Sequence, residues 1–264
     1  MTQKEQSRRT RRLIVEAAGA VFAEKGFNGA TIADVYQRLG LTKGAFYYYF
    51  KGKEELAQAV LASQIDEVGY PLVPRSTRLQ EMIDAGMLFA AQIHGDPVVQ
   101  GSLRLSLERG AHHQDRLRPY RDWIEHNRFA LSQAKDCGEL HAHVDVDSVA
   151  ELFVGAFTGI QVLSEVLADW SDLEVRTSVL LKHILPIIAL PGVLAQLDMA
   201  PGRAERVRAD FERIRAEQAE AQAEAQAEAQ AESTKTEPGK AEPKRAEPKK
   251  EARGATPDQM AATA

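Results

Sequence analysis

Residues 42–50, TKGAFYYYF, place side chains that suit nucleic acid along one side of a short helix. If that helix begins after Thr42, positions 43, 44, 47 and 48 share one side, and positions 46, 49 and 50 share the other. Lysine reaches phosphate or guanine, glycine lets the backbone approach a duplex, and tyrosine hydroxyls donate to phosphate oxygens. The first set is Lys43, Gly44, Tyr47 and Tyr48, so the chemistry that we predict here is recognition of DNA.

A second group of chemistry-bearing side chains is Cys137, His141 and His143. Such residues bind zinc when a second pair of ligands follows at a standard spacing. No such pair follows, and the other adjacent histidines, His112 and His113, lie in a polar segment. We therefore predict no metal site, no catalytic residues and no cofactor. A metal-dependent enzyme is the weaker alternative.

Two short helices joined by a tight turn must position the residues around position 43. A first helix is predicted over residues 7–25. Thr31 begins the second helix, Gly40 forms the turn, and Thr42 caps the third helix. A fourth helix begins at Lys53, where acidic residues in its first turn favour a helix start. This is a helix-turn-helix whose second helix is shaped for the major groove.

The charge of the chain is divided unevenly along its length. Residues 1–53 carry ten Lys/Arg against four Asp/Glu, whereas residues 54–200 carry eleven against twenty-one. A basic amino-terminal region on an acidic body directs that region toward a polyanion. The overall net charge of −5 conceals this division.

The remaining periodicity is helical, and no segment alternates convincingly with the two-residue period of a strand, so we predict an all-α fold. The expected domains are a helix-turn-helix DNA-binding domain over residues 1–52 and a ligand-binding and dimerisation domain over residues 53–200. Residues 201–264 form a low-complexity tail. Its AEAQ repeats over 219–232 favour a helix without an apolar face, and the proline-containing repeats that follow favour disorder.

The composition indicates a soluble protein of the cytoplasm. The longest apolar run, residues 184–197, is broken by prolines and a glycine, so no membrane span is expected. The basic start of the chain has no apolar segment behind it, which predicts no signal peptide. The single cysteine, Cys137, excludes an internal disulfide and suits a reducing compartment.

The block AAGAVFAEKGFNGATIADVYQRLGLTKGAFYYYFKGKEEL resembles the TetR family of bacterial repressors over about residues 8–60. The resemblance implies a DNA-binding repressor in which Thr42, Lys43, Gly44, Tyr47 and Tyr48 contact the groove and the DNA backbone. It also implies a phosphate contact for Lys53. Arginines near the amino end would add backbone contacts, although a solvated terminus explains them nearly as well.

The segment over residues 118–173 resembles the γ-butyrolactone receptors, a branch of this family that controls antibiotic production. The likeness rests on Trp123 in the sequence PYRDWI, on GAFTG, and on ELAQAVLASQ near the fourth helix. It implies an apolar pocket in which Trp123 packs against a small lactone with an alkyl tail. Thr158 and Gln64 are the polar groups expected to meet the ligand oxygens. Alternatively, Trp123 belongs to an ordinary core and Thr158 bonds to its own helix backbone.

The last two helices expected in the body, residues 149–167 and 172–189, are apolar almost all round. Such helices are buried on more than one side, which predicts a homodimer interface. The expected mechanism is a dimer on a pseudo-palindromic operator, released when a lactone shifts the fourth helix. A TetR-type efflux regulator, or a pseudo-receptor for a different metabolite, are the alternatives within the same fold.

Overall fold

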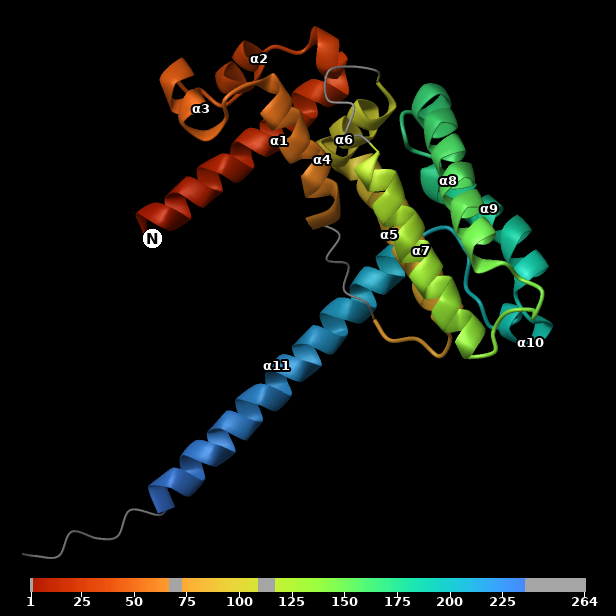
Figure 1. Ribbon diagram of the computed structural model, residues 1–264. Coiled ribbons are helices and arrows are strands. Elements are labelled where there is room, and N and C mark those ends of the chain that lie inside the picture. The colour runs from red at the N-terminus through yellow and green to blue at the C-terminus, as the bar shows by residue number, and fades with distance from the viewer. Residues whose placement is uncertain (1, 67–72, 109–116, 236–264) are drawn as a thin grey trace, which may run out of the picture. The chain divides into compact units, whose positions relative to one another are not determined.

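The computed structural model describes residues 2–66, 73–108 and 117–235, except for the side chains of residues 64–66, 224, 225 and 227–235. These residues form helices and contain no strand, only an isolated bridge between Leu140 and Ala189, so the all-α prediction is confirmed. The elements are shown in Figure 1. They are α1 (Gln3–Gly29), α2 (Ile32–Arg38), α3 (Lys43–Tyr49), α4 (Lys53–Asp66), α5 (Arg78–Gly95), α6 (Pro97–Leu107), α7 (Arg118–Asp136), α8 (Val146–Ala168), α9 (Leu173–Ile188), α10 (Pro191–Leu194) and α11 (Arg203–Lys235).

Helix α1 is longer than predicted at both ends. It begins at Gln3, four residues before the predicted start, because Thr2 and Glu5 form a capping box. The Thr2 hydroxyl accepts from the Glu5 amide, and the Glu5 carboxylate accepts from the Thr2 amide. Gly26, the expected stop, leaves the helical conformation with φ of +68°, but the chain then resumes a helix to Gly29. Gly26 therefore ends the first helical segment of α1, as predicted, and one more turn of helix follows this kink.

The predicted signals of the helix-turn-helix are confirmed. The Thr31 hydroxyl accepts from the Asp34 amide and the Asp34 carboxylate accepts from the Thr31 amide, so α2 begins with a capping box. Gly40 has φ of +65° in the turn, and the Thr42 hydroxyl accepts from the Ala45 amide at the start of α3. Phe46 and Phe50 of α3 are buried in one core with α1, α4 and α6.

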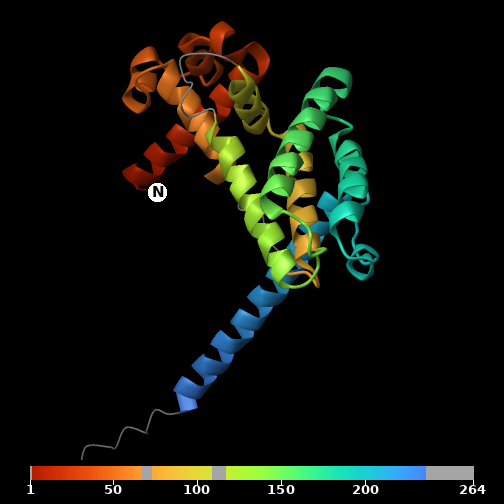
Figure 2. The same cartoon turned by 45° about the vertical axis from the view of Figure 1, so that its right-hand side comes forward.

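Helices α5, α7, α8 and α9 share a second core, built from residues such as Ile83, Leu131 and Leu185. Helix α5 packs against α7 and α9, and α8 packs against both α7 and α9. Figure 2 shows these helices on the other side of α6 from α2 and α3. Glu139, just after α7, fixes the start of α5 by accepting from the amides of Arg78 and Leu79.

The start of α11 belongs to the compact unit that ends at Ala216, although the predicted tail begins at residue 201. Val207 is buried beside Leu88 of α5. The Arg203 guanidinium donates to both carboxylate oxygens of Asp84, at 2.7 and 2.9 Å. The sequence of this segment is polar, and its packing depends on a partner far away in the chain. The three predicted domain ranges, 1–52, 53–200 and 201–264, stay predictions.

Candidate DNA-binding surface and ligand pocket

The two faces of α3 separate as the sequence predicts. Phe46 and Phe50 are buried, and Tyr49 packs against the same core. Tyr47 is 44% exposed and Tyr48 is 78% exposed. Thr42, Lys43 and Gly44 are exposed as well, so every residue predicted on the recognition face is open to an external partner.

Gly44 has no structural reason to be a glycine within this chain. A Cβ atom built on it meets nothing within 4 Å, and its backbone lies in an ordinary helix. A glycine in a helix is destabilising relative to alanine by about 0.5–1 kcal/mol. The smallest residue therefore stands on the exposed face where only an external surface would restrict its size.

The start of α1 lies beside this face. Gln3, Gln6 and Ser7 line a crevice together with Tyr48 and Tyr49. The arginines that follow in α1, at positions 8, 9, 11 and 12, are exposed. One of them, Arg11, stacks over the Phe50 ring at 4.9 Å from its centroid.

Lys53 occupies a different position from the one that its predicted role suggests. Its ammonium donates to the carbonyl oxygens of Phe27 (2.8 Å) and Ala30 (3.0 Å), and it lies 4.5 Å from the centroid of the Phe27 ring. These bonds tie the start of α4 to the end of α1. A phosphate contact for Lys53 stays a prediction.

An ion pair holds α2 against α1. The Lys25 ammonium donates to Asp34 at 2.7 Å, and Arg38 pairs with Glu24 at the same distance. Hydrogen bonding from Lys25, and then from Thr31, lowers the pKa of Asp34 to about 2. Asp34 is therefore ionised at physiological pH and keeps both its helix cap and its ion pair.

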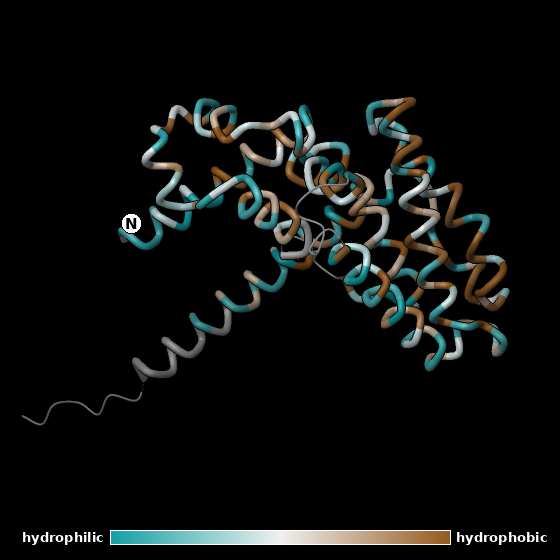
Figure 3. The backbone as a smooth tube through the Cα atoms, turned by 45° about the horizontal axis from the view of Figure 1, so that its top comes forward, coloured by the Kyte–Doolittle hydropathy of each residue, from teal (hydrophilic) through white to brown (hydrophobic). Residues whose placement is uncertain are grey.

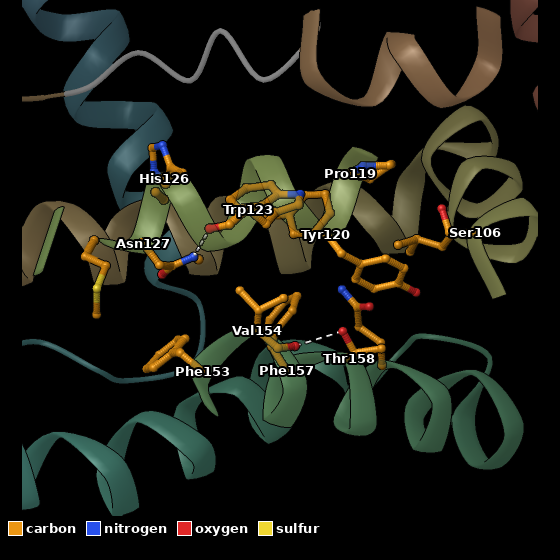
Figure 4. Close-up of a pocket in the computed structure, with 16 residues that line it drawn as sticks. Ser106, Pro119, Tyr120, Trp123, His126, Asn127, Phe153, Val154, Phe157 and Thr158 are labelled. Carbon is orange, nitrogen blue, oxygen red and sulfur yellow. Dashed lines mark hydrogen bonds between the residues drawn. The ribbon is translucent and has the colours of Figure 1, made fainter. Parts of the chain in front are cut away.

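A pocket lies between α5, α6, α7 and α8 (Figure 4). Its cavity volume is about 60 Å³, below the range of about 300–1,000 Å³ that is usual for small-molecule sites, so a ligand would have to widen it. Among the described residues that line it, none is Asp, Glu, Lys or Arg. The lining residues are Met82, Ala85, Gly86, Phe89, Leu103, Ser106, Pro119, Tyr120, Trp123, His126, Asn127, Phe153, Val154, Phe157, Thr158 and Gln161.

Aromatic rings form one wall of the pocket. Trp123 and Phe89 lie with their centroids 4.6 Å apart, and Phe157 lies 5.8 Å from Phe89. The Trp123 Nε1–H is buried and has no hydrogen-bond partner in the described part of the chain. A buried donor without a partner is costly, so a ligand acceptor that reached it would gain a strong interaction.

The other polar groups are partly committed. The Thr158 hydroxyl donates to the Val154 carbonyl at 2.8 Å, and the Asn127 amide donates to the Trp123 carbonyl at the same distance (Figure 4). Both oxygens can still accept. The side chain of buried Gln161 has no hydrogen bond to any other described residue. Among the described lining residues, the pocket thus offers the Trp123 donor, the Gln161 amide, and the side-chain oxygens of Thr158, Asn127 and Ser106 as acceptors, besides the polar groups of Tyr120 and His126.

His126 stands at the edge of the pocket, against the edge of the Trp123 ring at 5.6 Å between centroids. The residue as a whole is exposed, yet partial burial of its ring lowers the pKa of His126. The imidazole is therefore mainly neutral at pH 7, and it adds no fixed charge to the pocket.

Among the described residues, no three or more His, Cys, Asp or Glu side chains gather to hold a metal ion. His141 and His143 stack on each other at 5.5 Å, and Cys137 is an exposed free thiol. The adjacent pair at 112 and 113 lies outside the described residues.

The comparisons with known proteins decide the family. A family model described as bacterial regulatory proteins of the tetR family matches residues 14–60. The A-factor receptor protein of Streptomyces griseus is 33% identical over 224 residues, which cover 84% of this chain and 78% of the receptor. The chain belongs to the TetR family. This TetR protein is a DNA-binding transcriptional regulator and not an enzyme.

Solved structures agree with this assignment. TylP, a TetR regulator from Streptomyces fradiae, matches with a TM-score of 0.70 at 43% identity, covering 78% of this chain and 98% of TylP. CprB from Streptomyces coelicolor, in complex with its biological operator sequence, matches with a TM-score of 0.62 over 76% and 98% of the two chains. At 23% identity that second likeness shows the fold alone. TetR regulators bind operator DNA and small ligands, typically as dimers.

Two of the three predicted ligand residues line one pocket in this TetR protein. Trp123 reaches it from α7 and Thr158 from α8, and the expected self-contact of Thr158 is also present. The side chain of Gln64 lies outside the described residues. The sequence reasoning did not include Asn127 and Gln161, although helical spacing from Trp123 and Thr158 could have indicated both.

An exposed apolar face covers α8 and α9, on the opposite side of α8 from the pocket. Hydrophobic positions recur along these helices (Figure 3). Among the described residues, helix α8 alone is long and apolar enough to cross a membrane, but one such helix is weak evidence, because a core helix of a soluble protein passes the same test. Its inner side packs on α7 and α9. The exposed residues of the face are Leu152, Val162, Leu163, Val166, Leu167, Val175, Val179 and Ile187.

Proposed function

We propose that this TetR protein is a repressor that binds a pseudo-palindromic operator as a homodimer and is released by a small γ-butyrolactone with an alkyl tail. The observation that carries the ligand class is the uncharged, largely apolar pocket that holds the unpartnered Trp123 Nε1–H. A lactone carbonyl would accept from that donor. A hydroxyl on the ring would donate to Thr158 Oγ1 or to the Asn127 carbonyl oxygen, and the alkyl tail would lie on the aromatic wall.

The same pocket disfavours the two alternatives to different degrees. An efflux regulator of the kind considered above senses flat or cationic compounds. A cation would find aromatic faces but no carboxylate among the described residues that line this pocket, so the pocket favours uncharged compounds over cations. A pseudo-receptor that takes a different neutral metabolite fits the same walls. Comparing a lactone with neutral molecules of similar size separates that alternative from the proposal.

The homodimer is supported by the exposed apolar face of α8 and α9. Contiguous apolar surface of this kind is costly in water and marks interaction sites. A twofold pairing through it would carry two copies of α3 into successive major grooves about 34–36 Å apart. The proposed site of action is the cytoplasm, on the nucleoid, where operator DNA lies. DNA contacts are assigned to Thr42, Lys43, Gly44, Tyr47 and Tyr48.

The test begins with the wild-type protein and duplexes selected from a random library. Anisotropy of a labelled duplex gives the operator affinity, and a synthetic γ-butyrolactone with a hexanoyl side chain is then added. We expect release of the duplex, and quenching of Trp123 fluorescence in a Trp170→Phe background, which leaves Trp123 as the single tryptophan. Release by cationic dyes without any response to the lactone would contradict the proposal, and so would a protein that selects no duplex.

Trp123→Phe serves as the matched variant because it keeps an aromatic ring but removes the Nε1 donor. It should retain operator affinity and lose about tenfold in lactone affinity, the typical cost of about 1.4 kcal/mol for one well-placed hydrogen bond. Equal lactone affinity in the two proteins would remove the indole N–H from the proposed site.

A further inference from the structure

Side chains at the end of α6 form hydrogen bonds with the backbone of α1 on both sides of its kink. Gly26 interrupts the helix, so the carbonyls of the preceding turn and the amide that follows lose their helical partners. The Arg104 guanidinium donates to the carbonyl oxygens of Ala23 (2.7 Å) and Glu24 (3.3 Å). The Glu108 carboxylate accepts from the Phe27 amide at 2.8 Å. A cation thus meets the carbonyl end of one helical segment, and an anion meets the amide end of the next.

The two gripping side chains also bind each other. Arg104 Nε lies 3.3 Å from Glu108 Oε1, one helical turn away along α6. A Cβ atom on Gly26 would overlap the Glu108 carboxylate, so the kink and the carboxylate occupy complementary space. We call Arg104 and Glu108 the α6 clamp.

The same short part of α1 carries the DNA-reading helices. Glu24 pairs with Arg38 and Lys25 pairs with Asp34, both of α2. Lys53, at the start of α4, donates to two carbonyls at the end of α1. A displacement of the kink would therefore be passed to α2 and to α4 through charged contacts rather than through a loose loop.

The opposite side of α6 belongs to the ligand pocket. Leu103 and Ser106 line it. Leu103 directly precedes Arg104, and Ser106 lies between Arg104 and Glu108 in the sequence. Nearer the start of α6, this helix crosses α1 where Gly101 meets Gly19. The two backbones are so close there that a Cβ atom on either glycine would overlap the other helix. Helix α6 thus contacts the pocket on one side and the backbone of α1 on the other.

We propose that Arg104 and Glu108 are positioning residues that couple occupancy of the pocket to the orientation of α2 and α3. Only the coupling to the ligand rests on the proposed function; the role of Arg104 and Glu108 in holding the reading helices does not. Without any ligand, the clamp holds the kink in the arrangement that reads the operator. With a ligand beside Leu103, a shift of α6 moves the kink through the clamp.

The decisive variant is Glu108→Met, which has a similar size but offers no acceptor to the Phe27 amide. Glu108→Gln is the conservative rescue, because its amide oxygen can still accept. Removing a negative charge favours DNA binding by simple electrostatics. The clamp instead predicts that Glu108→Met weakens operator binding by about tenfold, whereas Glu108→Gln stays within about threefold of the wild type.

Asp122→Asn is the matched control. It removes one negative charge from another i,i+4 pair with arginine, Arg118–Asp122 on α7. Its operator affinity should equal or slightly exceed that of the wild type. Thermal unfolding of each variant excludes loss of the fold as the cause. If Glu108→Met fails to fold, Arg104→Lys replaces it, because lysine keeps the charge but cannot hold both carbonyls and the carboxylate.

The coupling is read from the operator affinity with and without the hexanoyl γ-butyrolactone. In Glu108→Met, the ratio of these affinities should fall at least threefold below the wild-type ratio, with lactone affinity of the DNA-free protein unchanged. Wild-type operator affinity and a wild-type ratio in Glu108→Met would overturn the clamp. A wild-type protein that ignores the lactone would instead contradict the proposed function, and ligand-free operator affinity would still decide whether the clamp positions the reading helices.

Discussion

Substituting Gly44 by alanine should move stability and DNA binding in opposite directions. The added Cβ atom meets nothing within 4 Å, and Gly44 lies in the first turn of α3 with helical backbone angles. Removing a glycine from a helix therefore stabilises the folded protein, by up to about 1 kcal/mol. No contact within the chain is lost.

The same methyl group would stand on the exposed face between Lys43 and Tyr47, where the duplex is proposed to approach. Overpacking a close contact costs about 1–3 kcal/mol. A dimer presents the change twice, so the loss is at least about 2 kcal/mol, or about thirtyfold in operator affinity. The expected signature is a protein that melts later and binds less tightly.

Urea unfolding measures the stability, and anisotropy with a selected duplex measures the affinity. Gly95→Ala is the control, because Gly95 also has open space around its Cβ position but lies at the end of α5, among residues with no proposed DNA contact. It should unfold at equal or higher urea and bind DNA normally. If Gly44→Ala retains wild-type operator affinity, α3 does not approach the duplex through this face.

Five further variants, in three sets, test other parts of the structure. Gly86→Leu should place a side chain in the open space of the pocket, giving a repressor that binds its operator but no longer responds to the lactone in the release assay. Lys43→Met should reduce the slope of log affinity against log salt by about one per protomer. Lys53→Met should lower the unfolding free energy by about 1–2 kcal/mol, because its ammonium donates to the carbonyls of Phe27 and Ala30, and a lower salt slope in this variant would support the predicted phosphate contact. Truncation after Ala216 should leave urea unfolding unchanged. Truncation after Gly202 should lower stability by about 3 kcal/mol, because it removes Val207 from Leu88 and removes Arg203 from buried Asp84, which then keeps Arg75 as its ion-pair partner.

Local signals in the sequence were sufficient for the DNA-reading helices. The threonine caps at Thr31 and Thr42 act on amides three residues away, and the turn at Gly40 needs only a residue that tolerates positive φ. The exposed and buried sides of α3 follow from helical spacing alone. These features depend on neighbours in the chain, so the order of residues contains them.

The features that the sequence did not predict depend on distant partners. A helical turn follows the break at Gly26 because Glu108, eighty-one residues from Phe27, accepts from the Phe27 amide. The polar start of α11 packs because Arg203 meets a buried carboxylate on α5. Lys53 is a cation beside a DNA-binding motif, and only the folded structure shows that its ammonium donates hydrogen bonds to the carbonyl oxygens of Phe27 and Ala30. Spacing along one helix cannot reveal such contacts.

Helix α8 joins the two proposed interactions of the body. Its inner side presents Phe157 and Thr158 to the pocket, and its outer side presents Leu163 and Val166 to solvent, where the second protomer is expected. A ligand and a partner would then be separated by the thickness of one helix. Whereas the α6 clamp sets how the reading helices are held within one protomer, α8 would set how far apart the two protomers hold them.

If both respond to one ligand, reciprocity requires that operator DNA weakens lactone binding by the same factor by which the lactone weakens operator binding. A switch from 1:99 to 99:1 needs about 5.5 kcal/mol of differential binding. Because two pockets act on one operator, each would need to supply only about half of that energy.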